Sequence, residues 1–158
     1  MSALVVIPAR MAASRLPGKP LADIAGRPMI AWMVEIAAAA GVGPALVAAA
    51  EPEIAAAAQA AGAQAVLTDP DLPSGTDRVK AAADLFDPEG RHQVVVNLQG
   101  DMPTLDPGLI ATAIDALGTD ADMATLVSPS DDPTHRADPN VVKAIVSWQG
   151  STGRCLYF

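Results

Sequence analysis

The sequence predicts an α/β fold built on a mostly parallel sheet that helices cover on both faces. Short apolar runs with the character of buried strands alternate along the chain with longer segments of helical periodicity. Proline or serine stands at the start of these helical segments, and glycine follows two of them. Strands that alternate with helices form parallel sheets, and such sheets bind ligands beyond the carboxyl ends of their strands.

The expected strands are short runs rich in Val, Ile, Leu and Ala, and the first of them ends at Pro8. The one over residues 93–98 has three consecutive valines and a polar end. A hairpin connection over residues 148–153 is expected to lead into a last extended segment. The expected strands cover residues 3–7, 45–49, 65–67, 93–98, 123–127 and 141–146.

The expected helices share a recognisable first turn. Pro28, Pro52 and Pro107 stand where a first helical residue would be, and Ser74 with Asp77 resembles a capping box. Gly41 and a second glycine, at position 62, are expected to end the first two helices. The polar residues 128–140 are expected to form a loop. The expected helices cover residues 29–40, 52–61, 74–86 and 106–117.

The composition excludes several classes of protein. Apolar residues make up 51% of the 158, which is ordinary for a globular chain, and no apolar run is long enough to span a bilayer. A net charge of −8 argues against nonspecific binding to nucleic acid. The only cysteine, Cys155, permits no internal disulfide and fits an apolar packing residue. We therefore expect a cytoplasmic protein with no membrane segment and no nucleic-acid partner.

Familiar site motifs are absent from the sequence. Gly18-Lys19 does not complete a Walker sequence, because Ala13 stands at the required glycine and Pro20 at the required Ser or Thr. There is also no dinucleotide-binding fingerprint, paired cysteine or nucleophile elbow. His92 and His135 stand alone in polar surroundings and are interpreted as surface histidines.

The loop that follows the first strand concentrates positive charge. It carries Arg10, Arg15 and Lys19, together with Ser14 and several prolines, whereas the rest of the chain is strongly acidic. Three cations in one loop indicate a polyanionic ligand such as a triphosphate. The alternative is a solvated loop that only keeps the protein soluble. Proline stiffens the loop and lowers the entropy lost on binding, which favours the ligand.

Two more loops at the same edge of the sheet carry candidate site residues. The Ser74-Gly75-Thr76 helix start offers backbone N–H groups to an anion, a base or a sugar, although Ser74 could be an ordinary N-cap. Arg78 would face either this edge or solvent. Asp101, directly after Gly100, could hold Mg²⁺ against phosphates, or it could be an Asp of a tight turn.

Together these segments resemble one family, the 3-deoxy-manno-octulosonate (KDO) cytidylyltransferases, also called CMP-KDO synthetases. The segments follow one another in the family's order and with its gaps, across essentially the whole chain. The resembling motifs are residues 7–10 (Ile-Pro-Ala-Arg), 14–21 (Ser-Arg-Leu-Pro-Gly-Lys-Pro-Leu), 74–78 (Ser-Gly-Thr-Asp-Arg), 97–101 (Asn-Leu-Gln-Gly-Asp) and 138–143 (Asp-Pro-Asn-Val-Val-Lys).

The resemblance implies a three-layer α/β/α nucleotidyltransferase fold of the glycosyltransferase-A-like type. It also implies the Mg²⁺-dependent transfer of CMP from CTP to KDO, with release of pyrophosphate, for bacterial lipopolysaccharide. The catalytic residues implied by the motifs are Arg10, Arg15, Lys19 and Asp101, of which Asp101 also binds the Mg²⁺. The substrate-binding residues implied are Ala9, Ser14, Ser74, Gly75, Arg78, Gln99 and Lys143; Ala9, Ser74 and Gln99 would help read cytosine, while Arg78 and Lys143 would be supporting cations.

The sequence departs from the family pattern at three positions and in length. Met102 replaces a usual Glu, Leu72 a frequent His, and Ala50 a frequent Asp. The family also continues after Leu-Tyr-Phe with a part that supplies most of the KDO site, a second Mg²⁺-binding Asp and dimer contacts. We therefore expect residues 1–158 to be the nucleotide-binding portion of a homodimeric enzyme, with an apolar patch near Tyr157 and Phe158 that promotes self-association.

Three other functions stay open at this point. The chain could belong to a cytidylyltransferase for another sugar acid, such as sialic acid, because acceptor recognition falls mostly in the following part of the family's sequence. It could bind CTP and Mg²⁺ without turnover, because the second carboxylate is absent. A scaffolding protein without a ligand would leave the clustered cations unexplained.

Overall fold

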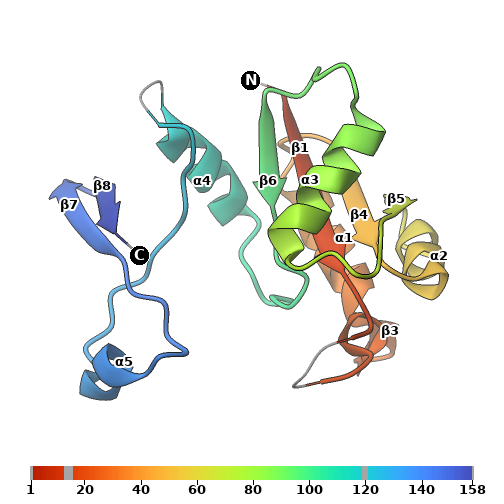
Figure 1. The fold of residues 1–158 in the computed structure, drawn as a ribbon, viewed down its shortest axis with the longest axis horizontal. Coiled ribbons are helices and arrows are strands. Elements are labelled where there is room, and N and C mark those ends of the chain that lie inside the picture. The colour runs from red at the N-terminus through yellow and green to blue at the C-terminus, as the bar shows by residue number, and fades with distance from the viewer. Residues whose placement is uncertain (1, 13–15, 119–120, 158) are drawn as a thin grey trace. The chain divides into compact units, whose positions relative to one another are not determined.

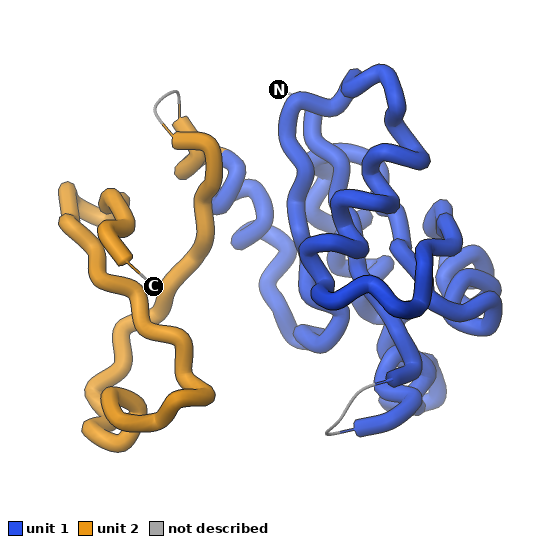
Figure 2. Tube along the Cα trace, viewed as in Figure 1, with its two compact units in different colours: residues 1–114 blue, residues 115–158 orange. Residues whose placement is uncertain are grey.

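The computed structural model describes residues 2–12, 16–118 and 121–157. The chain divides into a first compact unit, residues 1–114, and a second, residues 115–158 (Figure 2). Within the described residues, no helix combines the length and the apolar character that a membrane span requires.

The first unit is built on a four-stranded parallel sheet with the strand order β5-β4-β1-β6 (Figure 1). Strand β1 (Ala3–Ala9) pairs with β4 (Ala45–Ala49) on one side and with β6 (Val94–Asn97) on the other, while β5 (Gln64–Leu67) pairs with β4. The register places Val5 opposite both Ala45 and Val96. The parallel sheet expected from the sequence is therefore confirmed.

Strand β1 continues through Pro8 to Ala9, so the prediction that it ends at Pro8 was wrong. The C=O of Val6 accepts from the N–H of Leu98 on the β6 side, whereas the C=O of Ala9 accepts from Ala50 on the β4 side. By the alternation of a strand, Pro8 faces β6, beyond the last residue pair of the β1–β6 ladder. The N–H that proline lacks is therefore not needed for pairing.

Helices cover both faces of this sheet, as expected. Helices α1 (Met29–Ala39) and α2 (Pro52–Ala60) pack on one face, and α3 (Gly75–Phe86) packs on the other (Figure 1). Alternate residues of the strands enter the two cores, as the two-residue period of a strand requires. The first core includes Val5, Ile7, Val47, Ala49, Ile30, Met33, Ile54 and Ala58, and the second Leu4, Val6, Leu46, Ala48, Val79 and Ala82.

The helix ends follow the signals in the sequence, with small differences. Pro28 is the extended N-cap of α1 and not its first helical residue. The Oγ of Ser74 accepts from the N–H of Asp77 at 3.1 Å and donates to its carboxylate at 2.6 Å, which makes the expected cap of α3. The fourth expected helix is α4 (Gly108–Leu117), and its Ile110 packs into the first core.

A small hairpin that the sequence does not predict follows the short helix η1 (Lys19–Leu21). Its strands, β2 (Asp23–Ile24) and β3 (Arg27–Pro28), are only two residues long. The indole N–H of Trp32 donates to the C=O of Ile24 at 3.0 Å, and the Arg27 guanidinium lies 4.5 Å from the centre of the Trp32 ring. Contacts with α1 therefore support a hairpin that its own sequence hardly signals.

The second unit contains α5 (Pro133–Ala137) and an antiparallel hairpin of β7 (Ile145–Gln149) and β8 (Thr152–Tyr157). The hairpin was expected, but α5 replaces part of the expected polar loop. The strand expected over 123–127 is absent from the described residues, where this segment is irregular and exposed. The strand expected over 141–146 begins only at Ile145, because residues 138–143 form a turn around the C=O of Asp138.

The described part of the second unit has no hydrophobic core of its own. None of its described residues, 115–118 and 121–157, is buried. Tyr157 is exposed as expected, and Phe158 lies outside the described residues. Self-association through this surface stays a prediction.

Candidate functional site

A cleft of about 390 Å³ opens in the first unit at the carboxyl ends of β1 and β6. In the strand order β5-β4-β1-β6, β4 and β5 are added on one side of β1 and β6 on its other side, so the strand order reverses beside β1. Ligands of parallel sheets bind at such a reversal, so the cleft lies where the fold favours a site. The predicted site residues that line it are Ala9, Arg10, Lys19, Ser74, Gly75, Arg78, Gln99 and Asp101.

Three predicted site residues are not placed in this cleft. Ser14 and Arg15 lie outside the described residues. Lys143 belongs to the second unit, where its ammonium donates to the backbone C=O of Asp138. Its expected role as a supporting cation stays a prediction.

Lys19 and Asp101 meet across the cleft from two different loops. The Nζ of Lys19 lies 2.6 Å from Oδ2 of Asp101, and both side chains are partly exposed. The lack of a side chain at Gly100 allows the backbone just before Asp101 to pack closely against β1, because a Cβ at Gly100 would lie only 3.0 Å from the carbonyl oxygen of Pro8. The cation predicted to bind phosphate and the carboxylate predicted to bind Mg²⁺ are therefore direct neighbours.

The loop that carries these cations is closed by the backbone of Met11. The N–H of Gly18 donates to the C=O of Met11 at 3.0 Å, and the N–H of Met11 donates to Oε2 of Glu51 at 3.0 Å. Sequence reasoning missed Glu51. Its place two residues after β4, the strand that neighbours β1, was the only signal that could have identified it.

Arg78 is buried and lines the cleft, so of the two orientations expected it takes the one toward the sheet edge and not the one toward solvent. Its guanidinium donates to the hydroxyl of Thr68 at 2.6 Å and to the C=O groups of Asp69 and Pro70 at 3.0 and 3.2 Å. Burial lowers the pKa of Arg78, and the charge of Arg10 lowers that pKa further. Because its guanidinium donates hydrogen bonds to three oxygens of residues 68–70, Arg78 stabilises the loop before α3 while it also lines the cleft.

The side chain of Gln99 is held by a chain of polar contacts. Its Nε2 donates to Oδ1 of Asn97 at 2.8 Å, and Nδ2 of Asn97 donates to the hydroxyl of Thr76 at 3.4 Å. The amide also lies over Gly75, whose Cβ, if present, would be 3.8 Å from Oε1 of Gln99. The start of α3 and the end of β6 thus present backbone and amide groups to the same cleft.

The acidic side chains allow one kind of metal site in this cleft. Among the described residues, no group of three or more His, Cys, Asp or Glu side chains could hold a metal ion. Asp101 is the single carboxylate among the described residues that line the cleft. One carboxylate fits Mg²⁺, which takes its other ligands from substrate phosphates and water, and does not fit a metal held by protein alone.

The histidines and the cysteine do not form a second site. Nδ1 of His92 lies 2.7 Å from Oδ2 of Asp87 in a largely buried contact, so the surface interpretation of His92 was wrong. His135 is exposed on α5 beside Ser130, as expected. Cys155 is exposed on β8, which contradicts its expected packing role.

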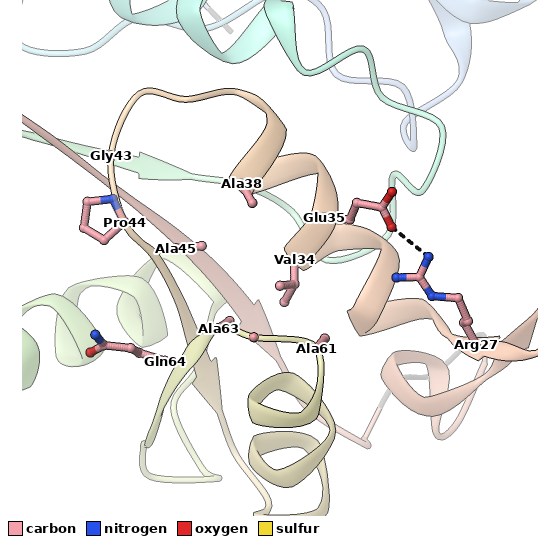
Figure 3. Close-up of a pocket in the computed structure, with 11 residues that line it drawn as sticks. Arg27, Val34, Glu35, Ala38, Gly43, Pro44, Ala45, Ala61, Ala63 and Gln64 are labelled. Atoms are coloured by element: carbon pink, nitrogen blue, oxygen red, sulfur yellow. Dashed lines mark hydrogen bonds and ion pairs between the residues drawn. The ribbon is translucent and has the colours of Figure 1, made fainter.

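A larger hollow of about 570 Å³ lies beside α1, next to the turns that lead into β4 and β5 (Figure 3). Its walls are mostly small side chains such as Ala38 and Ala61. The charged Arg27 at its edge forms an ion pair with Glu35, with 2.7 Å between the guanidinium nitrogen and Oε2. None of the predicted site residues that the structure describes lines it. The smaller cleft is therefore the candidate site.

Known proteins similar to this chain share one activity in their names. The 3-deoxy-manno-octulosonate cytidylyltransferase of Rhodospirillum rubrum is 60% identical over 98% of this chain and 63% of its own length. That of Parvibaculum lavamentivorans is 59% identical over 98% of this chain and 61% of its own length. The chain thus spans less than two thirds of these curated relatives.

Solved structures agree with this similarity. A structure of CMP:2-keto-3-deoxy-manno-octonic acid synthetase complexed with CTP is 41% identical, with a TM-score of 0.66 over 74% of this chain and 47% of that one. A nucleotidyl transferase from Methanothermobacter thermautotroptrophicus, 20% identical over 72% of this chain and 56% of that one with a TM-score of 0.58, shares the fold. The family described as Cytidylyltransferase matches residues 4–157, and this chain belongs to that family.

Proposed function

We propose that this chain is the nucleotide-binding portion of a 3-deoxy-manno-octulosonate cytidylyltransferase, which transfers CMP from CTP to KDO and releases pyrophosphate. The observation that carries the proposal is the meeting of Arg10, Lys19 and Asp101 with the start of α3 in one cleft. The names of relatives about 60% identical favour KDO as the acceptor.

The cleft is suited to a nucleoside triphosphate. Arg10 and Lys19 supply positive charge for the phosphates, and Arg15 is proposed to add a third cation. The N–H groups at the start of α3, near Ser74 and Gly75, and the amide of Gln99 offer hydrogen bonds to the base and sugar. Ala9, at the end of β1, would help read cytosine.

Asp101 is the residue that would hold Mg²⁺. When bound there, the ion would neutralise charge on the phosphate oxygens. The Lys19–Asp101 ion pair gives this arrangement a physical consequence. A carboxylate that binds a cation attracts the Lys19 ammonium less, and the ammonium is then free to contact phosphate.

The proposed transfer needs positioning and charge neutralisation more than covalent catalysis. The acceptor hydroxyl attacks the α-phosphorus and releases its proton to water, while the bond between the α-phosphorus and the oxygen that bridges it to the β-phosphorus breaks. The leaving pyrophosphate takes the electron pair of that bond. Lys19 and Arg10 would stabilise the negative charge that increases on these phosphates.

The whole protein is proposed to act in the cytoplasm as a homodimer, in lipopolysaccharide synthesis. A transferase for another sugar acid, such as sialic acid, is the second candidate. For the 158-residue chain alone, the presence of one carboxylate among the described residues of the cleft also favours a module that binds CTP and Mg²⁺ without turnover.

Calorimetric titration with CTP and Mg²⁺ tests the nucleotide half of the proposal. We expect micromolar CTP binding that ATP does not match and that Lys19→Ala abolishes, whereas Lys80→Ala, at an exposed cation of α3, leaves it intact. A folded chain that binds no CTP would contradict the proposal. Pyrophosphate release with KDO, compared with sialic acid and with no acceptor, separates the three candidates.

A further inference from the structure

The entry to the cationic loop is held by contacts on both sides of one peptide segment. The C=O of Ala9 accepts from the N–H of Ala50 at 3.0 Å, and two residues later the N–H of Met11 donates to the carboxylate of Glu51 at 3.0 Å. The C=O of Met11 then accepts from Gly18 and closes the loop. The backbone of Met11 is therefore fixed at its donor and at its acceptor.

Glu51 is an unexpected residue to find beside this loop. A carboxylate close to a triphosphate repels it, so its presence at the edge of an anion site requires a compensating role. Glu51 is partly buried at the N-cap of α2, and its charge acts on the buried guanidinium of Arg78 in opposition to that of Arg10. Both the hydrogen bond and the charge of Glu51 thus act on the cationic side of the cleft.

We propose that Glu51 is a positioning residue for triphosphate binding, acting through the backbone N–H of Met11. The proposal rests on the proposed function, because the loop that Glu51 holds is the one assigned to the phosphates. Arg10 directly precedes Met11, and Lys19 directly follows Gly18, which the C=O of Met11 holds. A fixed Met11 therefore sets the backbone beside two phosphate-binding cations before the ligand arrives.

The hydrogen bond and the charge make opposite contributions to CTP affinity. The bond needs only an oxygen acceptor at the right distance, which the amide of Glu51→Gln also provides. Glu51→Asp keeps the charge, but its side chain is one methylene shorter and cannot reach Met11 from the same backbone. Glu51→Ala removes both the bond and the charge.

The test measures CTP affinity by calorimetry and the hydrogen exchange of the Met11 amide for these three variants. We expect Glu51→Asp to weaken CTP binding about tenfold, since a hydrogen bond to a charged group contributes roughly that factor or more. Glu51→Ala should weaken it less, because the repulsive charge is lost together with the bond, and both variants should lose protection at Met11. Glu51→Gln should bind CTP at least as tightly as wild type and keep Met11 protected. Glu53→Ala, which removes an exposed acid of the same helix turn, is the matched control and should change neither measurement.

The outcomes separate this inference from the proposed function. If wild type binds no CTP, the proposed function fails, while protection at Met11 still tests the contact with Glu51. If wild type binds CTP and Glu51→Asp binds it equally well, the positioning role is wrong. Glu51→Gln as weak as Glu51→Asp would also overturn it, and this pair remains decisive if Glu51→Ala does not fold.

Discussion

The two edges of the parallel sheet use charged residues in different ways. At the amino edge, the carboxylate of Asp87 accepts from the backbone N–H and the ring of His92 and from Arg91, all within five residues of the chain. At the carboxyl edge, Lys19 meets Asp101 and Glu51 meets the Met11 backbone across long stretches of sequence. A buried carboxylate with partners close in sequence stabilises a turn, whereas partly exposed charges brought together from distant loops make a place for a ligand.

Arg78 gives the largest expected effect, because it lies at the carboxyl edge but is buried like a structural residue. Arg78→Leu should lower the free energy of unfolding by about 3 kcal/mol, since it leaves the Thr68 hydroxyl and two backbone carbonyls without their donor. Urea unfolding measures this change. A decrease in the free energy of unfolding of less than about 1 kcal/mol, the usual range for an exposed ion, would show that Arg78 does not stabilise the fold as a buried residue.

Asp101 should affect the ligand much more than the fold. With Mg²⁺ present, Asp101→Asn should weaken CTP binding about tenfold, because it removes the carboxylate that we assign to the ion. Without Mg²⁺, the same variant should bind CTP at least as well as wild type, because a negative charge near the phosphates is gone. Titrations with and without Mg²⁺ measure the change in CTP affinity in both conditions. An equal loss of CTP affinity in the two conditions would argue against a metal at Asp101.

Asp87 should show its effect only in acid. Hydrogen bonds from the backbone N–H groups of His92 and Arg91 hold the pKa of Asp87 well below its ordinary value of 3.8. A carboxyl whose pKa is lower in the folded state stabilises the fold above that ordinary value, and the stabilisation is lost as the pH falls below it. Asp87→Asn should therefore be less stable at neutral pH and show a flatter loss of stability in acid.

Thermal unfolding between neutral and acidic pH measures this difference, with Asp84→Asn as the control. Asp84 is an exposed acid of α3 whose partner is Lys80. If the wild type and Asp87→Asn lose stability in parallel as the pH falls, the turn at the amino edge does not depend on the Asp87 charge.

The smallest expected effect belongs to Lys80, whose ion pair with Asp84 is exposed on the surface of α3. Lys80→Ala should change the free energy of unfolding by less than about 0.5 kcal/mol, as for other exposed pairs one helix turn apart. Urea unfolding in low and high salt checks this. A larger change would show that exposure alone does not separate the two uses of charge.

The sequence was sufficient to predict the sheet and the loops that form the cleft. Short apolar runs such as Ala45–Ala49 indicate buried strands. Loops that follow parallel strands lie together at the carboxyl edge of the sheet, so the positions of the cleft residues followed from the strand assignment. The contacts of Arg78 and Glu51 were not predictable, because both depend on how loops distant in sequence pack. The run at 123–127 shows the converse, since apolar character alone does not form a strand without a neighbour to pair with.

The position of β6 in the sheet also has a consequence for the order of folding. Strands β1, β4 and β5 join neighbours in sequence through α1 and α2, whereas β6 pairs Val94 with Ala3 only after the longest loop of the sheet has closed. Closing a longer loop costs more entropy, so non-local pairings tend to form late. The cleft has β1 on one side and β6 on the other, and it can therefore exist only after this last strand has docked.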